Sequence, residues 1–133
     1  MTTRSAFETY LETMSGVLPT QWENVNYTPV TGQPYQAVYM LKSNPDNPTF
    51  GDGFYRENGL LQISLRYPQN TGAGAAEAMA DKLLNFFPRG LTLTDGANTI
   101  VVSKTAQIQP PMIDGDRFVI NVRIPYFVNI FPS

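Results

Sequence analysis

The feature that most constrains this sequence is a segment near its C-terminal end, residues 117–130 (RFVINVRIPYFVNI). Large apolar residues occupy every second position there without a polar interruption: Phe118, Ile120, Val122, Ile124, Tyr126, Val128 and Ile130. Because side chains alternate between the two faces of a strand, this pattern predicts one long strand with a continuous apolar face. Pro125 lacks an amide hydrogen, so we expect the strand to lie at a sheet edge or to carry a bulge there.

A second strand with the same alternation is predicted at residues 60–67, and we expect its apolar side chains to face helices. These side chains are Leu61, Ile63, Leu65 and Tyr67. Asn58-Gly59 is a strong turn signal, so we expect a turn just before this strand. The remaining strands are expected at residues 35–43, 54–57, 91–95 and 98–108.

Two amphipathic helices are predicted. The first starts near Ser5 and is ended by Gly16 and Pro19, and its apolar stripe comprises Phe7, Leu11, Met14 and Leu18. The second spans residues 75–87, and its apolar face comprises Ala76, Met79, Ala80, Leu83 and Phe87. Because helices and strands do not alternate strictly, the fold class predicted for residues 1–133 is a single α+β domain, with two helices packed on a mixed or antiparallel sheet.

The composition excludes most catalytic chemistry. The 133 residues include no Cys and no His, which removes thiol nucleophiles, Ser-His-Asp triads and His-ligated metals. Gly72-Ala73-Gly74 does not continue into a nucleotide-binding fingerprint, since Glu77 stands where a small residue is needed. Asp114 and Asp116 lack the spacing of a calcium loop. We therefore expect no catalytic residue, no cofactor and no metal.

The charge and hydropathy patterns limit the partners. A net charge of −2 argues against a protein whose main role is to grip nucleic acid, because phosphate binding needs clustered Lys and Arg. No apolar stretch approaches the ~18 residues of a membrane-spanning helix, so no membrane partner is expected. The other, mostly polar set of alternate positions in residues 117–131 nevertheless includes Val119, Phe127 and Phe131. This surplus apolar surface needs either a second layer or a neighbouring subunit.

Residues 43–58 are rich in Pro, Gly, Asn and Asp, and we expect an exposed loop that orders on contact with a partner. Aromatic and Arg side chains dominate interface energetics, which makes this loop and the last strand the source of candidate contacts. The candidate partner-interface residues are Phe50, Phe54, Tyr55, Arg56, Phe127 and Phe131.

Several segments, distributed along nearly the whole chain, together resemble a known family. They are Trp22-Glu23-Asn24, Pro29, Tyr35, Asn58-Gly59-Leu60-Leu61-Gln62-Ile63, Tyr67-Pro68, Ala78-Met79-Ala80-Asp81-Lys82-Leu83 and Phe86-Phe87-Pro88-Arg89-Gly90. With the N-terminal helix and the apolar closing strand, they resemble the tail-terminator-like proteins of long-tailed bacteriophages and prophages, which are related in fold to the phage lambda tail terminator.

The resemblance implies a structural protein without a cofactor. Members form six-fold rings that cap the tail tube, stop its polymerisation and offer a surface for joining the head. The implied partners are further copies of the chain in a hexameric ring, the tail tube protein and a head–tail connector protein, with DNA only passing through the ring. The implied location is the virion tail, assembled in the bacterial host cytoplasm.

Two other interpretations remain open at the level of sequence. One is a small monomeric α+β enzyme or ligand-binding domain that uses carboxylates in a cleft, which predicts a monomer with a concave pocket of titratable groups. The other keeps the phage setting but assigns the chain to the neck, as a head-completion protein.

Overall fold

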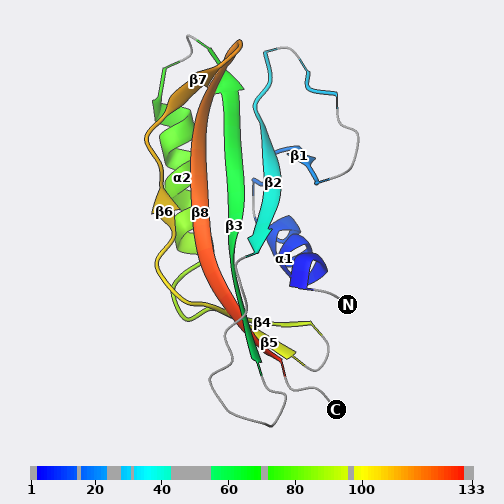
Figure 1. Ribbon diagram of the computed structural model, residues 1–133. Helices are drawn as coiled ribbons and strands as arrows, with labels where there is room; N and C mark the ends of the chain where they lie inside the picture. Colours follow the sequence, from blue (N-terminus) through cyan, green and yellow to red (C-terminus); the bar gives the residue numbers. More distant parts are fainter. Residues whose placement is uncertain are drawn as a thin grey trace.

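The computed structural model describes residues 3–14, 16–23, 28–30, 32–42, 55–69, 72–95 and 98–130. Its elements follow the order shown in Figure 1: α1 (Thr3–Glu12), β1 (Thr20–Gln21), β2 (Tyr35–Lys42), β3 (Tyr55–Pro68), α2 (Gly74–Phe86), β4 (Thr92–Asp95), β5 (Asn98–Val102), β6 (Gln107–Ile108), β7 (Met112–Asp114) and β8 (Arg117–Ile130). Two helices and one sheet make up this part of the chain, so the predicted α+β class is confirmed.

The eight strands form one curled sheet in the order β1-β2-β3-β8-β5-β4, and β6 and β7 also pair with β8 (Figure 1). Its centre is the antiparallel pair of β3 and β8, which runs from Tyr55 opposite Ile130 to Pro68 opposite Arg117. Along the other side of β8, the short strands β7, β6 and β5 pair in succession. Because β1 runs parallel to β2 and the other pairs are antiparallel, the sheet is mixed.

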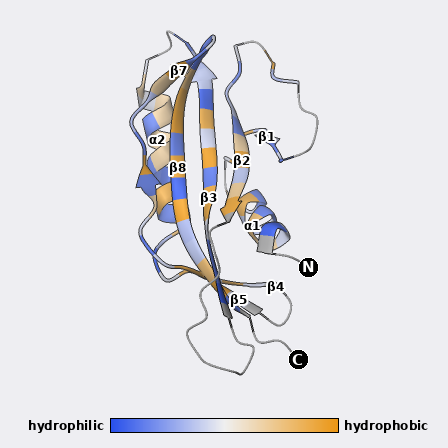
Figure 2. Ribbon diagram, viewed as in Figure 1, coloured by the Kyte–Doolittle hydropathy of each residue, from blue (hydrophilic) through white to orange (hydrophobic). Residues whose placement is uncertain are grey.

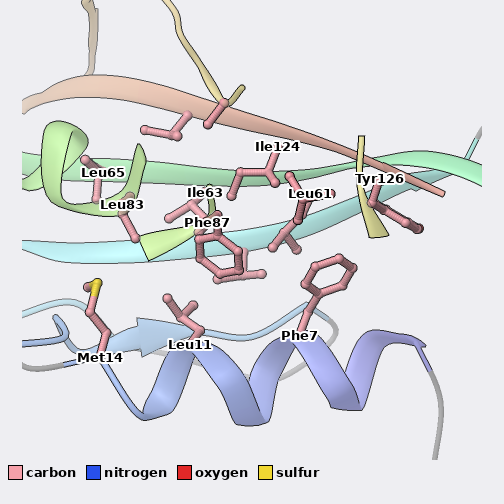
Figure 3. Close-up of a cluster of buried hydrophobic side chains, with 14 of the residues drawn as sticks. Phe7, Leu11, Met14, Leu61, Ile63, Leu65, Leu83, Phe87, Ile124 and Tyr126 are labelled. Atoms are coloured by element: carbon pink, nitrogen blue, oxygen red, sulfur yellow. The ribbon is translucent and has the colours of Figure 1, made fainter. Parts of the chain in front are cut away.

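The core lies between the two helices and one face of the sheet. The four apolar side chains predicted to face the helices, from Leu61 to Tyr67, are all buried. They pack with Phe7, Leu11 and Met14 of the N-terminal segment and with Leu83 and Phe87 around α2 (Figure 3). Figure 2 shows bands of hydrophobic and hydrophilic residues alternating along β3 and β8. The register predicted from this alternation is therefore confirmed.

The predicted turn at Asn58-Gly59 is wrong, because β3 runs through both residues as one strand. Gly59 lies opposite Tyr126 in the register. A Cβ built on Gly59 would come within 2.7 Å of the Tyr126 hydroxyl and 2.8 Å of the Leu41 carbonyl oxygen. The glycine therefore serves the close approach of an aromatic ring inside the sheet, and pairing with the long β8 overrides the local turn preference.

The single strand predicted at residues 98–108 is also wrong, since it is divided into β5 and β6. The interruption faces Pro125, whose carbonyl oxygen accepts a hydrogen bond from the Ser103 amide at 3.0 Å. The amide nitrogen and the carbonyl of one strand residue point to the same side, so the missing proline donor faces this gap. The expected edge position or bulge is therefore wrong: β8 is an interior strand with continuous pairing to β3, and it tolerates Pro125 because its outer neighbour is interrupted at that point.

The first helix is shorter than predicted and ends at Glu12. Met14 is still buried and Leu18 still packs against the core, because the following turns keep them on the same side. The second helix agrees with the prediction to within one residue at each end. The expected loop at residues 43–58 needs a partial correction, since its last four residues belong to β3, and residues 43–54 lie outside the described part of the chain.

Candidate functional site

The face of the sheet that points away from the helices, called here the open face, is formed by alternate residues of β2, β3 and β8. It carries Tyr35, Ala37, Tyr39 and Leu41 on β2, Arg56, Asn58, Leu60, Gln62, Ser64 and Arg66 on β3, and Arg117, Val119, Asn121, Arg123, Pro125, Phe127 and Asn129 on β8. Both helices pack on the opposite side. This face mixes cationic, amide and apolar side chains and is the candidate functional surface.

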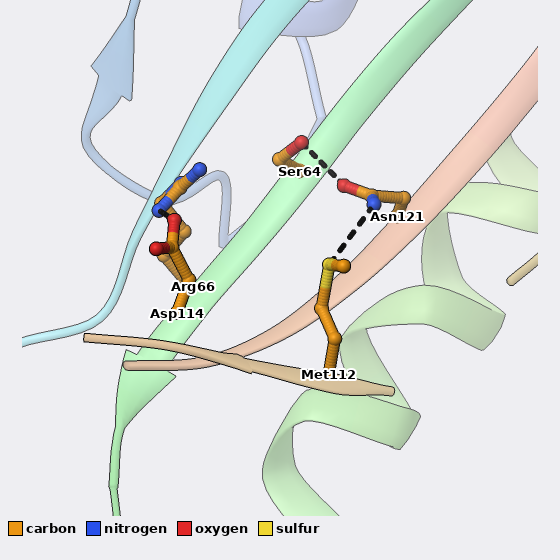
Figure 4. A network of polar contacts seen from close by, with 5 residues as sticks. All are labelled: Ser64, Arg66, Met112, Asp114 and Asn121. Atoms are coloured by element: carbon orange, nitrogen blue, oxygen red, sulfur yellow. Dashed lines mark hydrogen bonds and ion pairs between the residues drawn. The ribbon is translucent and has the colours of Figure 1, made fainter. Parts of the chain in front are cut away.

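At the end of the open face beside β7, the polar side chains bind to one another or to nearby backbone (Figure 4). Arg66 pairs with Asp114 at 2.8 Å, and Ser64 donates a hydrogen bond to the Asn121 amide oxygen. Burial lowers the pKa of Arg66, but the hydrogen bond and charge of Asp114 outweigh this effect and raise the pKa above its usual value. Arg117 is buried, donates to the carbonyl oxygens of Gln33 and Val30, and lies over the Tyr35 ring. The side chains at this end are occupied with structural contacts.

The other end carries two guanidinium groups, those of Arg56 and Arg123. Arg56 Nε donates to Asn129 Oδ1 at 2.9 Å, and the guanidinium carbon lies 4.3 Å from the centroid of Phe127. Arg123 Nε donates to Gln62 Oε1 at 3.0 Å. Within the described residues neither guanidinium forms an ion pair, and both bonds go to neutral amides. Each terminal pair of nitrogens is therefore held in a defined direction for another acceptor, such as a carboxylate.

A hollow of about 440 Å³ lies on the stretch of β3 and β8 between the register positions of the two arginines, neither of which lines it. Its floor includes Leu41, Leu60 and Pro125, which lie in one row across β2, β3 and β8. Lys104, on the connection between β5 and β6, is exposed on the lining. Leu41 is 46% exposed and adds apolar surface at this hollow.

The structure brings together two of the six predicted interface residues, Arg56 and Phe127, through their cation–π contact. Tyr55 lies at the start of β3, and nothing is described of its side chain. Phe50, Phe54 and Phe131 lie outside the described residues. The sequence analysis did not select Arg123. Its position four residues before Phe127, on the same face of the last strand, could have identified it.

The open face has the chemistry of a docking surface. Among the described residues, no group of three or more Asp, Glu, His or Cys side chains gathers closely enough to hold a metal ion. No helix in this part of the chain is long and apolar enough to cross a membrane. The surface offers fixed hydrogen-bond donors, cationic groups and apolar area, which suits recognition of another protein.

The profile of a family described as "Phage tail terminator protein" matches residues 2–126. A solved structure of a protein that carries no functional name is similar to this chain with a TM-score of 0.79, at 24% sequence identity and covering 98% of this chain and 95% of that chain. At this identity the likeness concerns the fold. No curated protein matches the chain in sequence. The family match confirms the resemblance expected from the sequence: this chain belongs to the phage tail terminator protein family, and it is therefore a structural component of the virion tail and not an enzyme.

Proposed function

We propose that this chain is the subunit that ends the tail tube: copies assemble into a ring that caps the tube, stops its polymerisation and offers the surface to which the head is joined. The observation that carries this proposal is the match to the tail terminator family over residues 2–126. The proposed partners are other copies of the chain, the tail tube protein and a head–tail connector protein, with DNA passing through the ring. Assembly takes place in the cytoplasm of the bacterial host.

The surface chemistry supports a role in assembly. A cap must bind its neighbours firmly through protein contacts and needs no reactive group. The open face provides such contacts through Arg56, Arg123 and the hollow around Leu41. Arg and exposed apolar side chains at the centre of a surface are typical of interface energetics.

Ring formation requires that two different surfaces of the subunit fit each other. A head-to-tail contact of this kind generates a closed ring when the rotation between neighbours closes, and a filament when it does not. The number six comes from the family resemblance alone. The interface residues proposed from the sequence remain the candidate contacts with the ring neighbours or the tube: Phe50, Phe54, Tyr55, Arg56, Phe127 and Phe131.

The test is the length of the tails formed in an infection or an assembly reaction that lacks this protein. We expect tails longer than normal that carry no heads, and we expect the wild-type chain supplied in trans to restore both properties. Measurement is by electron microscopy of negatively stained lysates. Tails of normal length that merely lack heads would instead assign the chain to the neck, and normal virions would contradict the proposal altogether.

A further inference from the structure

We propose that the open face of one copy binds the groove between α2 and β6 of a second copy, through opposite charges placed around apolar centres. This inference rests on the ring assembly proposed above and names the two surfaces that form it. The open face supplies the cations and the groove supplies the carboxylates. The two surfaces lie on different sides of the subunit, so the contact is head-to-tail.

The groove has an apolar floor and an acidic rim. It encloses about 250 Å³ and is lined by Ala80, Ile108 and Ile120 together with Glu77 and Asp81. Glu77 and Asp81 stand one turn apart on α2 and are both exposed. In the described part of the chain neither carboxylate forms an ion pair. Their charges are therefore available to a partner.

Apolar side chains extend this groove along the outer strands. Ile108 on β6 is 39% exposed, and Ile113 on β7 is 57% exposed. In the register with β8, Ile108 lies opposite Val122 and Ile113 opposite Phe118, which places both on the helix side of the sheet. Of the two, Ile108 lines the groove together with the two carboxylates, and Ile113 continues the exposed apolar surface along β7. In the proposed contact this apolar surface covers the hollow lined by Leu41, Leu60 and Pro125.

The charges select the second copy as the occupant. Lys104 lines the hollow, and Arg56 and Arg123 lie on either side of it along the strands, although the whole chain has a net charge of −2. Two open faces would therefore repel each other, and so would two acidic grooves. A cationic face against an acidic groove instead makes each subunit complementary to the next. The Nε bonds of the two arginines hold their terminal nitrogens ready for bidentate pairing with Glu77 or Asp81.

Cross-linking tests the contact directly, because the chain contains no Cys and engineered thiols report without background. The variants are Asp81→Cys, Arg123→Cys and the double variant, treated with a short bismaleimide in the presence and absence of tail tubes of the same phage. Tubes are included so that a ring formed only on a tube end is captured. We expect no cross-link in either single variant, dimers in their mixture and a ladder of larger species in the double variant. A mixture of Asp81→Cys with Arg89→Cys, which lies in the exposed turn after α2, is the matched control.

Charge reversal provides the second arm. In copies without engineered thiols, Arg123→Glu is expected to lower self-association, measured by sedimentation with and without tubes, about tenfold or more, whereas Arg89→Glu, with the same change in charge, leaves it unchanged. Glu77→Lys on the opposing copy is expected to restore pairing with Arg123→Glu. This recovery would not follow from a merely structural role of Arg123.

Three results would overturn the contact. One is a cross-linked fraction equal to that of the control mixture both with and without tubes. The second is efficient cross-linking of a single-Cys variant, which indicates a symmetric contact. The third is unchanged association of Arg123→Glu together with loss of binding to duplex DNA, which makes the face a nucleic-acid surface. If the cross-link is absent but tails lengthen without the protein, the contact fails and the proposed function stands. If the ladder forms but tail length does not respond, the proposed function fails and the contact stands.

Discussion

The two faces of the β3–β8 pair are built from alternating residues of the same strands, yet they differ in what they do. The helix side is mainly apolar and is covered by the helices along its centre, where Ile63 and Leu65 are completely buried. The open side combines cations, amides and apolar side chains, and Leu41 remains nearly half exposed. The comparison teaches that one alternating pattern can encode stability on one face and recognition on the other. Substitutions one residue apart should therefore affect different properties.

The largest effect is expected from a cavity on the covered face. Ile63→Ala should lower the free energy of unfolding by about 2–5 kcal/mol, because Ile63 is completely buried among well-packed neighbours. The matched control is Gln62→Ala on the open face, for which about 0.5 kcal/mol or less is expected. Urea unfolding followed by circular dichroism measures both. Equal effects of the two substitutions would contradict the assigned register.

The next largest effect is expected at high pH, which should lower the free energy of unfolding through Tyr126 on the covered face. Burial raises the pKa of Tyr126 to about 12, above the value of 10.0 expected in the unfolded chain. The folded state therefore keeps the phenolic proton longer than the unfolded state, so stability is complete below pH 10 and is lost as pH rises toward 12. The loss attributable to this group is at most about 2.7 kcal/mol. Tyr126→Phe should reduce this pH dependence, and an unchanged profile would show that the phenol is not responsible.

An effect of similar size is expected where the two faces meet at Gly59. Gly59→Ala should destabilise the fold by about 1–3 kcal/mol, because the added methyl group would overlap the Tyr126 hydroxyl and the Leu41 carbonyl oxygen. Gly74→Ala is the control, since nothing lies within 4 Å of a Cβ built there and the residue begins α2. Thermal unfolding should show a lower midpoint for the first variant and an equal or higher midpoint for the second.

The sequence was sufficient to predict the covered face, because alternation along residues 60–67 and 117–130 reports burial directly. It could not predict the path of the chain at Gly59, since a local turn signal was overridden by pairing with a strand nearly seventy residues away in sequence. The division of β5 from β6 was equally hidden, because it depends on the proline of another strand. Of the candidate surface, the pairing of Arg56 with Phe127 unites two predicted residues, whereas Lys104 and Leu41 join it only through tertiary packing.

The smallest effect on stability is expected from substitutions on the open face, and this is where function should change most. Arg123→Glu removes one hydrogen bond, to Gln62, on a partly exposed surface. We expect its unfolding free energy to stay within about 0.5 kcal/mol of the wild type. A larger loss, measured by urea unfolding, would mean that the open face also stabilises the fold.

The most direct test of the account is the length of tails assembled with the double variant Arg56→Glu/Arg123→Glu. The variant should fold with near wild-type stability, since among the described residues both guanidinium groups donate hydrogen bonds to neutral amides on a partly exposed surface. If the open face joins the subunits that end the tube, its tails should be as long as those formed without the protein. Tails of normal length, formed with a folded and stably expressed variant, would contradict the central claim that the open face is the assembly surface.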